Sequence, residues 1–267
     1  MSRAYLCGQV ERERIRGMAE RPAGSIDRLS VRGPPPGRPI MHQWWGKLLF
    51  LHWAVPADWL RPLIPEPLSI YTFGGLAWVG VTPFTMWGVR PAFLPPVPVL
   101  SESHELNVRT YVHLDGVPGV WFFSLDANNR LAVLGARLAF GLPYFHARMS
   151  LEQRGRTLRF ASRRVHSRAA PAEFEATWAG GDELPQPEPG SLDFFLVERY
   201  CLYSARAEKL YRVRIFHRPW PLHAARLSSF RSTMIGAQGL PSPGDEPLVH
   251  QQGEPLRVRV WPPARVR

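Results

Sequence analysis

The sequence has few lysines, few cysteines and no long apolar segment, and each shortage excludes a class of protein. Lys47 and Lys209 are the only lysines, so 31 of the 33 basic residues are arginine. Cys7 and Cys201 are the only cysteines, too few for the disulfide framework of a small secreted domain. No apolar run approaches the roughly 18 residues of a membrane-spanning helix, and the first residues lack a signal-peptide core. We therefore expect a cytoplasmic protein with no membrane partner.

Motifs that would name a common enzyme class are also missing. There is no glycine-rich phosphate loop or dinucleotide fingerprint, and Ser124 does not stand in a nucleophile elbow. His52, His146 and His217 are isolated, without the His-x-x-x-His or Cys-x-x-Cys spacing of metal ligands. We therefore expect neither a metal ion nor a cofactor.

The net charge of +11 raises the question of a nucleic-acid partner. The basic residues are spread along the chain without a dense block, which favours a general preference for arginine codons over a nucleic-acid surface. A nucleic-acid-associated protein stays an alternative hypothesis.

The composition indicates a chain of many short elements. It has 28 prolines and 22 glycines, which favour turns over long helices, and short strand patterns recur at close spacing. This predicts a mainly β (α+β) fold, an antiparallel sheet that closes or folds over into a β barrel with a few short helices. Residues 1–40 are rich in Arg, Glu and Pro and are predicted to be a disordered extension. Residues 41–267 are predicted to form a single domain.

The clearest pattern is a hairpin between residues 105 and 127. Residues 105–112 alternate between apolar and polar side chains, which predicts a strand, and Asp115-Gly116 favours a two-residue hairpin turn. Regular pairing across that turn places the polar residues of both strands on one sheet face. That face would carry Glu105, Asn107, Arg109, Ser124 and Asp126, with Arg109 opposite Phe122, Asn107 opposite Ser124 and Glu105 opposite Asp126.

A helix and another strand are expected to follow. Asn128 or Asn129 can cap a helix whose apolar positions have helical spacing, and Gly141 can end it. The strand then runs from Tyr144 to Gln153. Its first residues on one face are Tyr144, His146 and Arg148; the apolar helix positions are Leu131, Leu134 and Leu138.

Several longer motifs lie between Trp44 and Leu222. They include Leu49-Phe50-Leu51-His52-Trp53, Trp78-Val79-Gly80, Glu105-Leu106-Asn107-Val108-Arg109-Thr110-Tyr111-Val112, Leu142-Pro143-Tyr144, Phe195-Leu196-Val197-Glu198-Arg199-Tyr200 and His217-Arg218-Pro219-Trp220-Pro221-Leu222. With these motifs, the chain from about Met41 onward resembles the YqjF-like family of uncharacterised bacterial proteins. That family has no assigned reaction and in turn resembles acetoacetate decarboxylase in fold.

The decarboxylase pattern has a Glu at the start of a strand, a hairpin, a helix with Gly-Arg-Glu, and then Gly-Phe-Pro-Lys-Lys. This chain offers Glu105, the hairpin, Gly135-Ala136-Arg137, and Gly141-Leu142-Pro143-Tyr144-Phe145. The decarboxylase uses a lysine to form an imine with a keto acid, whereas Tyr144 and Phe145 stand at the two lysine positions here. The resemblance therefore implies a closed β barrel with a pocket and argues against imine chemistry.

We expect a pocket that binds a small anionic or carbonyl-bearing molecule. Buried Arg109 would need a carboxylate partner, either Glu105 or Asp126. Two carboxylates facing each other would raise the pKa of one of them. Whether the protein is an enzyme stays open, as does the alternative of a filled, purely structural barrel in which these residues form ordinary ion pairs. The candidate ligand-binding residues are Glu105, Asn107, Arg109, Ser124, Asp126, Arg137, Tyr144 and His146.

Overall fold

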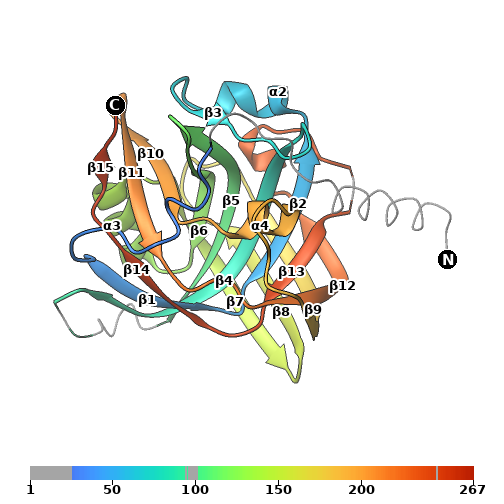
Figure 1. Cartoon of the computed structure of the whole chain (residues 1–267). Coiled ribbons are helices and arrows are strands. Elements are labelled where there is room, and N and C mark those ends of the chain that lie inside the picture. Colours follow the sequence, from blue (N-terminus) through green and yellow to red (C-terminus); the bar gives the residue numbers. More distant parts are fainter. Residues whose placement is uncertain (1–25, 94, 96–101, 245) are drawn as a thin grey trace.

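The computed structural model describes residues 26–93, 95, 102–244 and 246–267; Figure 1 shows the whole chain. Most of these residues lie in one sheet. Its strands are β1 Met41–Gly46, β2 Leu49–Val55, β3 Ser69–Ile70, β4 Ala77–Pro91, β5 Glu102–Leu114, β6 Val117–Ala127, β7 Tyr144–Arg154, β8 Thr157–Arg164, β9 Glu173–Glu183, β10 Cys201–Arg206, β11 Lys209–Phe216, β12 Leu222–Ser232, β13 Leu248–Gln252, β14 Leu256–Val260 and β15 Ala264–Arg265. The helices are α2 Ala57–Leu60, α3 Arg130–Phe140 and α4 Leu192–Val197, with 3-10 turns η1 Arg61–Leu63 and η3 Gly236–Gln238.

The described strands form two closed rings that share β4, β5 and β6. The first ring continues from β6 through β7, β8, β9, β12, β13 and β2 back to β4. The second ring continues from β6 through β10, β11, β14 and β1 back to β4. In Figure 1, β10 and β11 lie at the left, β2 and β12 at the right, and β5 and β6 between them. The mainly β fold of closed strands is therefore confirmed.

Two pairings depart from the predicted antiparallel arrangement. Strand β6 runs parallel to β10 at Val120 and Trp121 and parallel to β7 at Leu125 to Ala127. Parallel pairs need a long connection, and here the connections are α3 before β7 and the β7–α4 stretch before β10. No local pattern in a strand reveals a pairing of that kind.

Each ring has its own core because side chains alternate along the shared strands. On one face of β4 and β5, the apolar side chains pack with Phe160 and Phe174 from the far side of the first ring. These side chains are Val79, Val81, Leu106 and Val108. The side chains that point to the other face of β4 and β5 pack with Leu256 of β14 and with α4. They are those of Trp78, Phe84 and Tyr111. The alternate positions of β4 and β5 therefore face the second ring, and α4 packs against them.

Helix α3 begins and ends as predicted but buries a different face. Asn129 accepts hydrogen bonds from the backbone N–H groups of Leu131 and Ala132, and Gly141 ends the helix in the left-handed conformation that glycine favours. Within the helix, however, the buried residue is Val133. Leu131, Leu134 and Leu138 are more than half exposed, so the helical spacing was right while its buried side was not.

The predicted disordered extension is wrong for residues 26–40. Val31 is buried, and its carbonyl accepts a hydrogen bond of 2.8 Å from Arg214. Arg32 lies 3.8 Å from the carboxylate of Glu198, and the indole of Trp261 donates to the carbonyl of Gly37. Residues 26–40 therefore pack on the rings, and the boundary at residue 41 is not a structural one. Residues 1–25 lie outside the described residues.

No helix in the described part of the chain is both long and apolar enough to cross a membrane.

Candidate functional site

The polar face of β5 points into the second ring and meets the polar positions of β4. The register pairs Thr82 with Asn107 and Gly80 with Arg109, so these residues share one face. At Gly80 a Cβ would lie 3.1 Å from the ring of His52 and 3.3 Å from the Arg109 side chain. Glycine at this position therefore makes room for a histidine and an arginine side by side.

Glu105 and Tyr144 form the acid–phenol pair of this face. Strand β7 brings Tyr144 beside Leu125 of β6, and its hydroxyl donates to Oε2 of Glu105 at 2.8 Å. Burial raises the pKa of Glu105 to about 8 and the pKa of Tyr144 well above its usual 10. At neutral pH the pair is therefore a neutral phenol beside a mostly protonated carboxyl, which has its own O–H to donate.

Arg109 lies four residues further along β5 on the same face, and within the described residues it forms no ion pair with a carboxylate. Its Nε and Nη2 atoms are buried and have no hydrogen-bond partner among the described residues. Its guanidinium carbon lies 5.5 Å from the ring centroid of Phe50 and 6.0 Å from that of Tyr111. Oδ1 of Asn107 and Oγ1 of Thr82 are also buried and unpartnered within the described residues. Buried polar atoms in proteins nearly always have a hydrogen-bond partner. This face therefore has hydrogen-bond donors and acceptors that a ligand could pair with.

Ser124 and Asp126, predicted on the same face, lie on the other one. The turn at Asp115-Gly116 has the expected positive φ values, and Arg109 pairs with Phe122 as predicted. A β-bulge then shifts the register between Val108 and Arg109, which moves the later residues of β6 to the opposite face. The partners are therefore Val108 with Ser124, Asn107 with Leu125, Leu106 with Asp126 and Glu105 with Ala127.

Asp126 is paired, but not with Glu105 or Arg109. Its two carboxylate oxygens each accept a 2.7 Å hydrogen bond from Arg164 of β8, and both side chains are almost fully buried. Ser124 accepts a hydrogen bond from Gln238. These two residues therefore stabilise the junction of the rings, and the predicted partnership of Arg109 with Glu105 or Asp126 is not found.

The last two predicted residues lie at the margin of the site. Arg137, exposed on α3, donates a 2.8 Å hydrogen bond to the backbone carbonyl of Tyr144, so it holds the strand that carries the phenol. His146 is partly exposed on β7, and its backbone N–H donates to Nδ1 of His166. Of the predicted residues, the structure therefore brings Glu105 and Tyr144 into contact. Asn107 and Arg109 lie on the same face of β5 as Glu105.

Sequence reasoning missed His52, Tyr111 and Arg199 as parts of this neighbourhood. The Tyr111 hydroxyl donates to the carbonyl of Leu196 at 2.8 Å and lies 2.8 Å from Nε2 of His52. Strand parity in residues 49–53 could have placed His52 beside Phe50 on this face. Arg199 follows α4 outside any strand, so no periodicity could have placed it.

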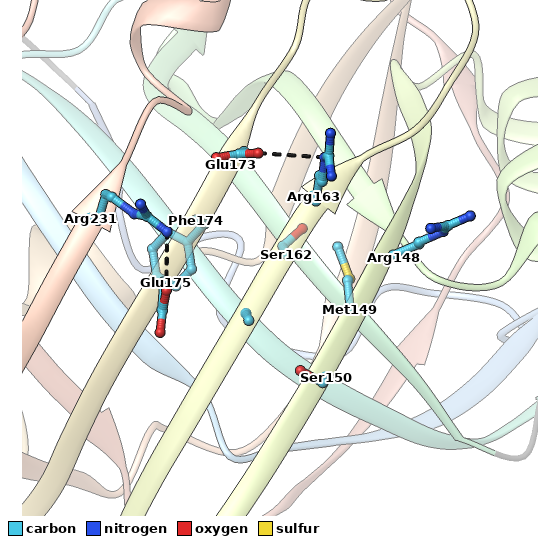
Figure 2. A pocket seen from close by; sticks show the side chains of 10 residues that line it. Arg148, Met149, Ser150, Ser162, Arg163, Glu173, Phe174, Glu175 and Arg231 are labelled. Atoms are coloured by element: carbon cyan, nitrogen blue, oxygen red, sulfur yellow. Dashed lines mark hydrogen bonds and ion pairs between the residues drawn. The ribbon is translucent and has the colours of Figure 1, made fainter.

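Two hollows lie elsewhere on the protein. One lies on β7, β8 and β9, where Figure 2 shows the side chains that line it. Its volume is about 340 Å³. In it, Arg163 lies 3.5 Å from Glu173 and Arg231 lies 3.3 Å from Glu175. The second, also about 340 Å³, lies between Phe122, Pro143 and Tyr203. Neither hollow includes Glu105 or Arg109 in its lining.

Within the described residues, no group of three or more His, Cys, Asp or Glu side chains is placed to hold a metal ion.

Solved structures with the same arrangement of strands are known. The enduracididine biosynthesis enzyme MppR, complexed with pyruvate, has a TM-score of 0.59 at 13% identity, covering 87% of this chain and 92% of that one. An acetoacetate decarboxylase has a TM-score of 0.58 at 17% identity, covering 86% of this chain and 90% of that one. The ringed sheet therefore has the acetoacetate decarboxylase-like fold.

Comparison of sequences then gives the family. The model of a family described as an uncharacterized conserved protein, DUF2071, matches residues 42–254. The uncharacterized protein YqjF of Bacillus subtilis (strain 168) is 41% identical over 228 residues, which cover 85% of this chain and 93% of that protein. The chain belongs to this YqjF-like family, as its motifs predicted.

Proposed function

We propose that this protein binds a small carboxylate that also carries a carbonyl group, in the second ring between Arg109 and Glu105. The observation that carries the proposal is the pair of buried, unpartnered guanidinium nitrogens of Arg109. A buried donor left without a partner costs about 1–3 kcal/mol, and an anionic ligand would offset that cost through charge-assisted hydrogen bonds.

The acid–phenol pair suits the carbonyl end of such a ligand. Protonated Glu105 can donate a hydrogen bond or a proton to a carbonyl oxygen, while Tyr144 orients the carboxyl through its 2.8 Å hydrogen bond. Any reaction at this site would be acid–base chemistry rather than imine formation. Lys47 and Lys209 are both exposed, and an imine-forming lysine needs a site that lowers its pKa.

The names of the structural neighbours fit this chemistry without establishing it. MppR is complexed with pyruvate, and acetoacetate decarboxylase is named for a keto acid. Both compounds join a carboxylate to a carbonyl group. At 13% and 17% identity these similarities indicate the fold alone. The proposed ligand class therefore rests on the side chains of Arg109 and Glu105.

Calorimetric titration with pyruvate at constant ionic strength tests the proposal. We expect millimolar or tighter binding, lost by at least tenfold in Arg109→Met and in Glu105→Ala. Arg163→Met is the matched control, because Arg163 is an exposed arginine on β8 with one surface partner. Equal affinity in all four proteins, or no binding by any of them, would refute the site and leave a purely structural ring. Native mass spectrometry of the purified protein would show a co-purifying ligand directly.

The nucleic-acid alternative is tested separately by salt. Two of the arginines in the Figure 2 hollow face carboxylates, which does not favour a phosphate surface. DNA binding whose affinity falls steeply with salt concentration would support the alternative.

A further inference from the structure

Arg199 is a second buried cation in the same neighbourhood. It follows α4, is 6% exposed, and its Nε and Nη2 have no hydrogen-bond partner among the described residues. The adjacent carboxylate of Glu198 is already engaged, since it accepts hydrogen bonds from the Tyr200 hydroxyl and from the Trp220 backbone N–H. Arg199 therefore has no anion of its own in this part of the protein.

Aromatic rings connect Arg199 to Arg109. The guanidinium carbon of Arg199 lies 4.9 Å from the centroid of Tyr111, and that of Arg109 lies 6.0 Å from the same centroid. On its other side, Arg199 shares Tyr71 with Arg28, at 5.2 and 4.9 Å. The three arginines thus form a row from the N-terminal segment to β5, in which neighbouring arginines share an aromatic ring.

The groups around Arg109 and Arg199 do not neutralise these two arginines. Burial lowers the pKa of Arg199 only to about 10, so the guanidinium stays charged at neutral pH. Burial also raises the pKa of Tyr111 and lowers that of His52 well below its usual value, so both stay neutral. Cation–π contacts compensate part of the cost of burial, but they supply no negative charge.

We propose that Arg199 is the second anion-binding residue of the site, and that the ligand carries two negatively charged groups, one held by Arg109 and one by Arg199. This deepens the proposed function and rests on it. The ligand class is a dianion that also has a carbonyl or similar acceptor for Glu105. A keto dicarboxylate and a carboxylate that also bears a phosphonate or phosphate share that chemistry. Without the ligand, the two like charges beside Tyr111 repel each other, and a dianion would relieve that repulsion.

The experiment compares three probes at constant ionic strength on the full-length protein. Pyruvate carries one carboxylate, 2-oxoglutarate carries two, and phosphonoacetate carries one carboxylate and one phosphonate. Affinity is measured by calorimetry, and the rise in melting temperature with concentration provides a second readout. We expect at least one dianion to bind tenfold or more tightly than pyruvate, and the better of the two identifies which kind of dianion the site takes.

Two variants distinguish the role of Arg199 from that of Arg109. Arg199→Met should reduce dianion affinity to that of pyruvate while pyruvate binding changes less than threefold, whereas Arg109→Met should weaken all the probes. If Arg199→Met does not fold, the ratio of dianion affinity to pyruvate affinity in the wild-type protein still tests the proposal. Dianions that bind no better than pyruvate would overturn the role of Arg199 while leaving the site at Arg109 standing. Loss of pyruvate binding together with dianion binding in Arg199→Met would also overturn it, by showing a structural role.

Discussion

Arg109→Met is expected to stabilise the ligand-free protein. The substitution keeps the unbranched stem that packs against Phe50 and Tyr111 but removes the charge. Two buried guanidinium nitrogens, Nε and Nη2, lack partners among the described residues and each cost about 1–3 kcal/mol. The two cation–π contacts at 5.5 and 6.0 Å are worth about 0.5–2 kcal/mol together. Methionine should therefore raise the free energy of unfolding by roughly 1–3 kcal/mol.

Urea denaturation followed by tryptophan fluorescence, in chloride buffer without carboxylates, measures this change. Each kcal/mol corresponds to about 2–4 °C in melting temperature for a chain of this size. Arg163→Met, which removes an exposed ion pair, should change stability by only about 0–1 kcal/mol. If Arg109→Met instead destabilised the protein by about 3–5 kcal/mol, the cost of breaking a buried ion pair, Arg109 would have a carboxylate partner and the argument for an anion site would fail.

Four other outcomes can be measured. Arg164→Met should lower the free energy of unfolding by about 3–5 kcal/mol in the same urea assay, because it leaves Asp126 buried without its cation; a loss below about 1 kcal/mol would contradict this. For Glu105, whose pKa is about 8 in the folded protein, the unfolded chain ionises first, so stability should fall as pH rises from about 4.5 to about 8. Glu105→Gln should flatten that dependence, and equal slopes in the two proteins would count against the raised pKa. Borohydride trapping with acetoacetate should add no mass at Lys47 or Lys209, and an adduct at either would restore imine chemistry. Deletion of residues 1–40 should lower the melting temperature, because residues 26–40 pack on the rings; an unchanged value would show that this packing contributes little.

The local signals in the sequence were sufficient for the elements that depend on neighbours in the chain. Asp115-Gly116 makes the predicted hairpin turn because both residues adopt positive φ. Asn129 caps α3, and Ser191 caps α4 through the backbone N–H of Phe194, because capping needs only a side chain within three residues. The mainly β class follows from the same kind of information.

The composition of the candidate site could be predicted only in part. Glu105, Asn107 and Arg109 share a face because strand alternation is a local rule. No sequence pattern predicted the bulge between Val108 and Arg109. Because of this bulge, Ser124 and Asp126 lie on the opposite face of the sheet.

Only the tertiary structure decided which charges are paired. The partner of Asp126 is Arg164, 38 residues away in the chain. Arg199 contacts the same Tyr111 ring as Arg109 because α4 packs in the core cluster that contains Tyr111. Tyr144 reaches Glu105 through a parallel pairing that no hairpin could predict. The sequence alone determined the strand class, the turns and the face of β5. The closing of the chain into two rings determined that two guanidinium nitrogens of Arg109 are buried without a partner among the described residues, because burial and pairing depend on residues that are distant in the sequence.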